Sequence, residues 1–255
     1  DLQCRAEEML EQLKEEGNAG AAVVLEPTTG EVLAISSFPD FDPNLFVLNS
    51  DPETLASYVA ADSNGPLYNR AVQGSYIPGS TVKPLIAAMA LDDGVVDENY
   101  EFTGEIIKKQ WTPKGYWPYP PITRVSNYSG PVNMSNAITK SDNIYFADVA
   151  LKAGWEKLEP FLKMIGFDER IPFDLRVSKP GYLNSSNYEN MQLLAATGYG
   201  QGELIISPLQ MACIFSSLAN NGDVMTPRLV RATRRMEGTD YAVVDEYSES
   251  VWKEN

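Results

Sequence analysis

The stretch that decides the fold reads Pro78-Gly79-Ser80-Thr81-Val82-Lys83-Pro84, and the apolar run 85–91 follows it directly. A helix that begins here carries Ser80 and Lys83 on one face of its first turn, because they are three residues apart. A serine hydroxyl becomes a good nucleophile only when a base lies beside it, and a lysine can be that base. The stretch therefore predicts a Ser-Lys catalytic pair at the start of a helix.

The chain has no histidine among its 255 residues. This composition excludes Ser-His-Asp and Cys-His catalysis, and it excludes every zinc site that needs a histidine. If the protein performs nucleophilic chemistry, a Ser-Lys pair is almost the only route left.

The bulk composition fits a globular protein of one large domain or two small ones, with 44% apolar residues. The net charge of −15 argues against a nucleic-acid partner, because an acidic chain repels phosphates.

Cys4 and Cys213 form no metal-binding pattern, and a disulfide between them is left open. No segment approaches the roughly 18 apolar residues of a membrane span. The chain begins at Asp1 without a methionine, so we expect a trimmed chain, in which the absence of an anchor or export signal carries little weight.

Hydrophobic periodicity and turn residues divide the chain into expected elements. Strands are expected at 19–25 and 32–36, as a β-hairpin, and at 227–235 and 241–246. Loops are expected at 38–46, 100–123 and 168–190. The second loop is rich in Trp, Tyr and Pro, which fits either a functional loop or aromatic side chains packed onto the body. Helices are expected at 2–16, 52–61, 80–93, 132–139, 143–153, 155–165 and from Ser207 to about Gly222.

A second motif reads Lys140-Ser141-Asp142-Asn143. Two interpretations are open for it. Ser141 or Asp142 caps the next helix, or Ser141 supplies a second hydroxyl that relays a proton while Asn143 binds substrate through its amide. Each motif is weak alone, since S-x-x-K recurs at Ser250/Lys253, where no turn or apolar helix supports it.

Together, S-x-x-K and S-D-N are two of the three motifs of penicillin-binding proteins and class A β-lactamases. The chain resembles the transpeptidase domain of penicillin-binding proteins, and its hairpin and the segment 38–44 are most similar to the monofunctional, class B branch. The resemblance spans nearly the whole chain. Its residues are Asp1-Leu2-Gln3 with Ala6-Glu7, Asn69-Arg70-Ala71, Tyr76 to Pro84, Ser141 to Phe146, Gly200-Gln201-Gly202-Glu203, Ser207 to Ala212 and Ala219 to Gly222.

This resemblance implies an α+β fold, with a central antiparallel sheet flanked by helices and a helical lobe, in one transpeptidase domain over residues 1–255. It implies a serine-type D,D-transpeptidase that crosslinks peptidoglycan stem peptides ending in D-Ala-D-Ala and that β-lactams acylate. The roles that it assigns are nucleophile to Ser80, base to Lys83, proton transfer to Ser141, contact with the substrate amide to Asn143, and substrate binding to Asp142, Gly200, Gln201 and Gly202.

The resemblance also sets expectations for the setting of the protein. No metal or organic cofactor is needed. The expected place is the bacterial cell envelope, on the extracytoplasmic face of the cytoplasmic membrane. The full-length protein is expected to have a membrane anchor and an N-terminal pedestal domain. Its expected partners are cell-wall synthesis proteins, and no nucleic acid is expected. Two alternatives remain: a serine β-lactamase or β-lactam sensor on the same scaffold, and a non-catalytic envelope module.

The third motif of the family, Lys-Thr/Ser-Gly, is absent. The nearest string is Lys179-Pro180-Gly181, which has a different middle residue and precedes the Gly-Gln-Gly segment instead of following it. We therefore expect a domain truncated at Asn255, before the third motif. The missing part would carry sheet strands, one wall of the cleft and one oxyanion N–H, and the activity of these 255 residues alone is left open.

Overall fold

The computed structural model describes residues 1–48, 51–60, 65–184 and 187–254, and it divides the chain into two compact units. Unit 1 comprises Asp1–Tyr76, Glu169–Lys179 and Ile206–Asn255, and unit 2 comprises Ile77–Asp168 and Pro180–Ile205. All eight residues predicted for the site lie in unit 2. The expectation of one transpeptidase domain, incomplete at its C-terminus, stays a prediction.

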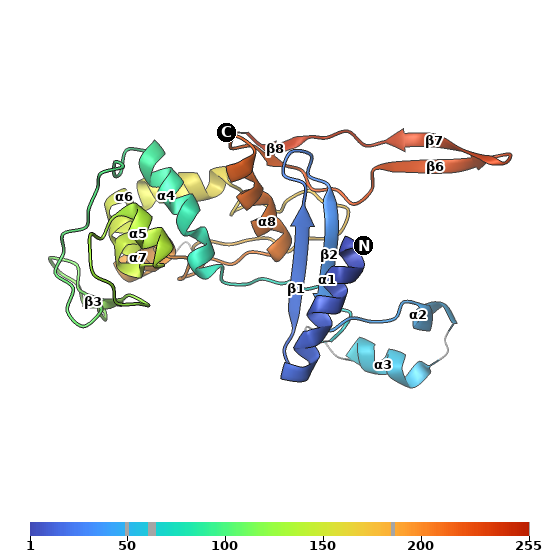
Figure 1. Ribbon diagram of the computed structural model, residues 1–255, viewed down its shortest axis with the longest axis horizontal. Coiled ribbons are helices and arrows are strands. Elements are labelled where there is room, and N and C mark those ends of the chain that lie inside the picture. The colour runs from blue at the N-terminus through green and yellow to red at the C-terminus, as the bar shows by residue number, and fades with distance from the viewer. Residues whose placement is uncertain (49–50, 61–64, 185–186, 255) are drawn as a thin grey trace. The chain divides into compact units, whose positions relative to one another are not determined.

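Unit 1 is built on the hairpin of β1 (Gly20–Leu25) and β2 (Val32–Phe38), which pair antiparallel as the sequence predicted. Helix α1 (Leu2–Glu11), extended by a 3₁₀ turn at Gln12–Glu16, lies along β2 (Figure 1). The Gln3 amide donates to the backbone oxygen of Ile35 at 3.0 Å and accepts from its N–H at 2.9 Å. This side chain thereby satisfies backbone groups that an edge strand leaves unpaired.

The core of unit 1 lies between the hairpin and α8 (Pro208–Ser216). Ser207 caps α8 by accepting from the Gln210 N–H at 3.2 Å, as the Ser-Pro pair predicted. Cys213 is buried in this core as a small hydrophobe, and both cysteines are free, so they form no disulfide with each other. The residues of the core are Val72, Ile171, Val177, Leu209, Cys213 and Val224, with Val23, Leu25, Val32, Ile35, Phe173 and Trp252 against them.

The remaining elements of unit 1 are short. Helices α2 (Asn44–Leu48) and α3 (Pro52–Ala60) follow the hairpin, and a 3₁₀ turn at Ser217–Ala219 follows α8. Strand β5 (Val224–Met225) pairs with β8 (Val251–Lys253), and β6 (Ala232–Glu237) pairs with β7 (Asp240–Glu246). The β6–β7 hairpin is almost wholly exposed, so it adds little to the core.

Unit 2 is a helical lobe around α6 (Asn143–Met164). Helices α4 (Lys83–Asp92) and α7 (Met191–Gly198) pack against α6, and α5 (Met134–Thr139) precedes it (Figure 1). The first half of α6 is buried from Ile144 to Ala150, so the start of this helix is held rigidly inside the lobe. Two short strands, β3 (Gln110–Trp111) and β4 (Ile122–Thr123), pair antiparallel within the segment 100–123, which was expected to be loop and is called the aromatic loop below.

The predicted α+β class is confirmed, and most element boundaries agree within a few residues. The predicted stop at Gly154 is a bend inside α6, where φ is 64° and ψ is 172°. Helix α7 was missed, although Asn190 caps it by accepting from the Leu193 N–H at 3.1 Å. The prediction of loop at 44–46 was wrong, because α2 begins there, and the strand expected at 227–235 begins only at Ala232.

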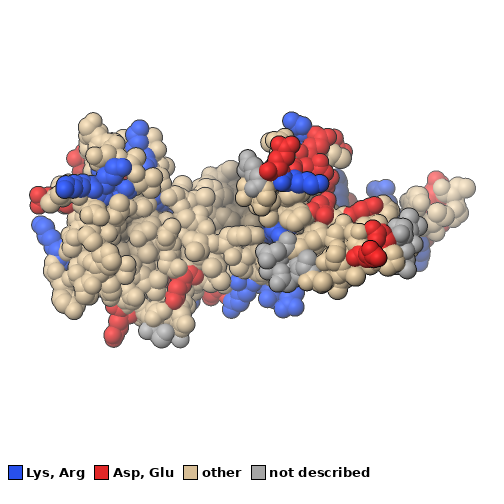
Figure 2. Space-filling model, turned by 90° about the horizontal axis from the view of Figure 1, so that it is seen from below, with Lys and Arg blue, Asp and Glu red and all other residues tan. Residues whose placement is uncertain are grey.

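Charged side chains of both signs are interspersed with uncharged ones on the face that Figure 2 shows, so the net charge does not gather into one acidic surface there. Among the residues that the structure describes, no helix is both long and apolar enough to cross a bilayer. The same residues bring together no group of three metal-binding side chains. The expectation that no metal is needed stays a prediction.

Candidate active site

Ser80 lies in a 3₁₀ turn, Gly79–Val82, that leads directly into α4. The turn is sharp because Gly79 has φ of 58°, in the left-handed region that glycine adopts without strain. Ser80 is exposed, while Val82 and Lys83 behind it are buried. The helix start leaves backbone N–H groups unpaired and partly positive around the serine, which suits a developing oxyanion.

Lys83 is buried, with only 2% of its surface exposed, and its amine lies among three oxygen atoms. The Nζ atom donates to the Ser141 backbone oxygen at 2.8 Å, to Ser141 Oγ at 3.0 Å and to Asn143 Oδ1 at 2.8 Å. Burial lowers the pKa of Lys83 to about 8, against an opposing rise from the charge of Asp142. A larger share of the amine is therefore neutral near pH 7 than in an exposed lysine, and the neutral amine is the form that can accept a proton.

Ser141 lies between Ser80 and Lys83. Its φ of 54° is left-handed, and in this conformation both its carbonyl and its hydroxyl meet the amine of Lys83. The Ser141 hydroxyl also donates to Ser80 Oγ at 2.8 Å. Hydrogen bonds thus run from Ser80 through Ser141 to Lys83. The sequence predicted all three residues, and the structure brings them together with Ser141 between Ser80 and Lys83; their catalytic roles stay predictions.

Asp142 caps α6, which confirms the capping interpretation of this motif. Its Oδ1 atom accepts from the Ile144 N–H at 2.9 Å, and its Oδ2 atom accepts from Tyr128 Oη at 2.7 Å and pairs with Arg124. With 1% of its surface exposed, this carboxylate is fully engaged inside the lobe. The substrate contact predicted for Asp142 stays a prediction, and this burial disfavours it.

Asn143 is the first residue of α6, and both ends of its amide are used. The Oδ1 atom accepts from Lys83, and the Nδ2 atom donates to the Thr123 backbone oxygen at 3.1 Å. The side chain therefore ties the lysine to the end of β4. Its predicted contact with the substrate amide stays a prediction.

The turn 200–202 after α7 lies against the turn that carries Ser80. The Gly79 N–H donates to the Gly200 backbone oxygen at 2.7 Å. Gly200 and Gly202 have φ of 81° and 75°, and Gln201 is exposed. The turn therefore lies next to Ser80, and the substrate-binding role of the three residues stays a prediction.

Replacing Gly200 with alanine is expected to damage both stability and acylation. A Cβ atom there would lie 1.7 Å from the Gly79 backbone oxygen, so the turn before Ser80 must move. The strained backbone alone costs about 1–3 kcal/mol. Thermal unfolding and the rate of labelling by a fluorescent penicillin measure the two effects. Gly94→Ala is the matched control, since Gly94 also has positive φ but nothing within 4 Å of the new Cβ atom. Equal losses in both variants would contradict the close approach.

Sequence reasoning missed three residues that hold the second motif in place. Thr123 accepts from Asn143, while Arg124 and Tyr128 engage Asp142. They lie 14 to 20 residues before their partners, at the end of an irregular loop. No rule of sequence spacing relates these residues to the second motif. The sequence showed only an arginine and a tyrosine in a segment without helical periodicity, which does not identify their partners.

In the aromatic loop between α4 and α5, some aromatic side chains pack onto the body of unit 2 and others are exposed, which are the two possibilities that the sequence left open. Trp111 is buried and packs edge-on against Phe102, with ring centroids 5.0 Å apart. Tyr116 in contrast is 93% exposed. Trp117 and both of these residues line a cavity of about 420 Å³ in unit 2.

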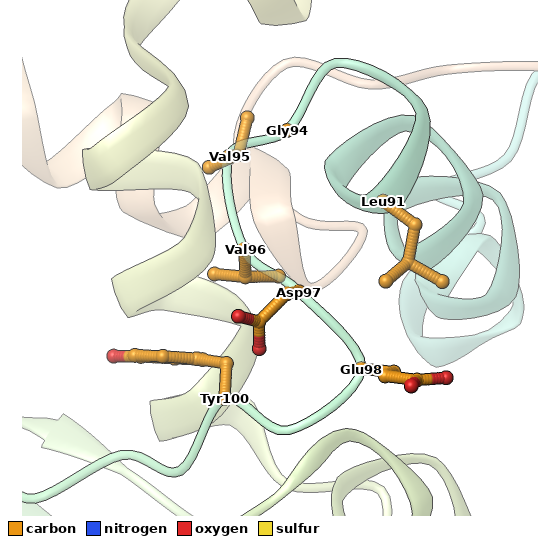
Figure 3. A pocket seen from close by; sticks show the side chains of 7 residues that line it. All are labelled: Leu91, Gly94, Val95, Val96, Asp97, Glu98 and Tyr100. Carbon is orange, nitrogen blue, oxygen red and sulfur yellow. The ribbon is translucent and has the colours of Figure 1, made fainter.

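Another cavity, of about 620 Å³, lies at the C-terminal end of α4 (Figure 3). It is lined by Leu91, Tyr100 and the residues 94–98. A helix of ten residues is about 15 Å long, so this cavity lies at the other end of α4 from Lys83. Neither serine nor lysine lines it, which leaves the groups around Ser80 as the candidate active site.

The penicillin binding protein transpeptidase domain family matches residues 20–254. The chain belongs to this family. The resemblance to the transpeptidase domain of penicillin-binding proteins that the sequence showed is therefore confirmed.

Several known members of the family are similar to this chain. Penicillin-binding protein 3 of Bacillus subtilis is 37% identical over 224 residues, which are 88% of this chain and 32% of that protein. Peptidoglycan D,D-transpeptidase MrdA of Haemophilus influenzae is 33% identical over 92% of this chain and 36% of its own length. The solved penicillin G acyl-enzyme complex of penicillin-binding protein A from M. tuberculosis has a TM-score of 0.78 at 28% identity, covering 92% of this chain and 53% of that one. The chain spans about a third of the length of the curated relatives it matches.

Proposed function

We propose that this chain carries the nucleophile and base of a peptidoglycan D,D-transpeptidase, which crosslinks stem peptides through an acyl-enzyme on Ser80. The observation that carries the proposal is the hydrogen-bonded path from Ser80 through Ser141 to a buried lysine. Burial gives Lys83 a lowered pKa, so a base is present beside an exposed hydroxyl in a chain without histidine.

In the acylation step, Ser80 Oγ attacks the carbonyl carbon between the two D-alanines. The Ser80 proton passes to Ser141 Oγ while the Ser141 proton passes to neutral Lys83, which requires only that the two hydroxyl hydrogens rotate. The Ser80 backbone N–H faces the developing oxyanion. The protonated Lys83 then returns a proton through Ser141 to the leaving D-alanine. Asn143 keeps Lys83 in place and contacts the substrate amide.

In the second step, an amine of a neighbouring stem peptide attacks the ester on Ser80 and forms the crosslink. A β-lactam enters the first step in place of the stem peptide and leaves a stable ester. The names of MrdA and the acyl-enzyme complexes of penicillin-binding protein A support this reaction class. The turn 200–202 and Asp142 complete the proposed substrate-binding residues, with Asp142 acting through Asn143 because it is buried.

The setting proposed for this function is the bacterial cell envelope, on the extracytoplasmic face of the cytoplasmic membrane. The proposal includes a membrane anchor and cell-wall synthesis proteins as partners in the full-length protein, with no nucleic acid and no cofactor. The family and the names of its members, which include peptidoglycan transpeptidases, support the envelope.

Exchange of the terminal residue of a stem peptide tests this function. The purified protein is incubated with a pentapeptide that ends in D-Ala-D-Ala and with an excess of D-methionine. The masses of the products are then measured by mass spectrometry. We expect peptides in which D-methionine replaces the last D-alanine. Rapid turnover of benzylpenicillin without any exchange would contradict the proposal and indicate a serine β-lactamase. A stable penicillin ester without exchange would also contradict it and indicate a sensor.

A further inference from the structure

A buried ion pair lies directly behind the catalytic groups, at the start of α6. The guanidinium of Arg124, with 5% of the residue exposed, pairs with the carboxylate of Asp142, which is 1% exposed. Tyr128 closes the cluster, because its hydroxyl donates to Asp142 at 2.7 Å and its ring lies 4.4 Å from the Arg124 Cζ atom. A carboxylate that caps a helix is usually solvated, so this burial requires a partner.

Asp142 stands between the two residues that bind the amine of Lys83. Ser141 and Asn143 both accept from Nζ, so a negative charge on Asp142 acts on Lys83 at close range. This charge favours the ammonium form, and in the described part of the chain it is the charge that opposes the effect of burial on Lys83. A catalytic base needs the opposite, a share of neutral amine near pH 7.

The segment that carries Arg124 holds two consecutive residues of the second motif. The Thr123 carbonyl accepts from the Asn143 amide, and the next residue, Arg124, pairs with Asp142. The backbone N–H of Arg124 donates to the Lys109 oxygen at 3.0 Å, which fixes the end of β4 beside the motif. The guanidinium is therefore placed by backbone contacts as well as by its own ion pair.

We propose that Arg124 is a positioning residue that neutralises Asp142 and so allows Lys83 to remain uncharged beside Ser141. Its role in catalysis rests on the proposed function, while its effect on the protonation of Lys83 can be measured without any activity. Arg124 acts through Asp142 and contacts neither the nucleophile nor the base in the hydrogen bonds of the site.

The other charged or titratable groups near this cluster have partners elsewhere. On α6, Asp148 accepts from Tyr100 Oη at 2.5 Å and pairs with Lys152, and Tyr145 packs against the Tyr100 ring. Within the cluster itself the ionisable groups are Asp142, Arg124 and Tyr128, and burial followed by the hydrogen bond to Asp142 raises the pKa of the Tyr128 hydroxyl, so it stays neutral. Lys83 otherwise faces hydroxyl, carbonyl and amide oxygens and the Phe146 ring. Asp142 is thus the charge that acts on Lys83, and Arg124 is the ion-pair partner of Asp142.

Direct titration of Lys83 tests the proposal. The protein is labelled with ¹³C-lysine, the Cε signal of Lys83 is assigned with the Lys83→Met variant, and its chemical shift is followed against pH. In Arg124→Met the unpaired Asp142 should move the midpoint upward by about 1 pH unit. Asp142→Asn, which keeps the helix cap, should move it downward. The double variant Arg124→Met/Asp142→Asn should return to within about 0.5 unit of the parent protein, because both charges are gone. Arg124→Lys, which keeps the charge, should stay near the parent value.

The midpoints decide the proposal independently of the reaction. A midpoint in folded Arg124→Met equal to that of the parent protein would overturn the role of Arg124. If circular dichroism shows that this variant does not fold, the double variant is compared with Asp142→Asn, and removal of the Arg124 charge must then raise the midpoint. Acylation of the parent protein by benzylpenicillin is followed separately, so a failure of the proposed function is distinguished from a failure of this inference.

Discussion

Replacing Ser80 with alanine is expected to abolish acylation by penicillin. Ser80 Oγ is the exposed hydroxyl at the end of the path to Lys83, and alanine removes the atom that forms the ester. Ser141 does not substitute for it, because its hydroxyl and carbonyl are held by the buried amine. The rate of labelling by a fluorescent penicillin measures the effect, and no covalent signal should appear above that of the denatured protein.

Ser250→Ala is the matched control for this prediction. Ser250 is the serine of the other S-x-x-K string, and its hydroxyl donates to Thr226 Oγ1 at 3.0 Å. The control variant should be labelled at the parent rate. Labelling of Ser80→Ala at a measurable rate would show that another nucleophile operates and would contradict the assignment.

Replacing Lys83 with methionine is expected to slow acylation by about 10²–10⁴-fold, the usual contribution of a general base. Methionine fills the space of the lysine stem but cannot accept a proton. In the parent protein the rate should rise as the pH rises through about 8, since only the neutral amine acts and burial places the pKa of Lys83 there. The rate of labelling, followed from pH 6 to pH 10, should lose this rise in the variant.

Lys253→Met is the matched control for Lys83→Met. Lys253 belongs to the second S-x-x-K string and pairs with Glu169 at 2.7 Å on the surface of unit 1. Loss of the Lys253 amine should change neither the rate of labelling by the fluorescent penicillin nor the dependence of that rate on pH. Parent-like kinetics in Lys83→Met would exclude Lys83 as the base, and a parent profile without a rise near pH 8 would show that its protonation does not limit the reaction.

The proximity of Ser80 to Lys83 and the helix cap at the second motif could be predicted because their signals are local. Ser80 and Lys83 are three residues apart on a helix start, and Ser141 and Asn143 flank a helix cap. Local spacing determines on which side of a turn such residues lie. The absence of histidine excluded the common alternative catalytic groups, and the four residues predicted as catalytic lie within one hydrogen-bonded cluster.

The supporting groups could not be predicted because tertiary packing brings them in. Arg124 and Tyr128 reach Asp142 from an irregular loop, and the left-handed conformation of Ser141 depends on its contacts rather than on its residue type. Helix α7 was missed because it is short and its residues are apolar on several sides, which hides the helical period. The placement of Gly200 against Gly79 likewise follows from the fold of unit 2.

The central claim is that Ser80 is the residue that forms the acyl-enzyme. The most direct test is to incubate the parent protein with benzylpenicillin, digest it, and locate the added group by tandem mass spectrometry. The account predicts one modified residue, Ser80, in the peptide that contains Lys83. A penicilloyl group on any other residue, or no covalent adduct at all, would contradict it.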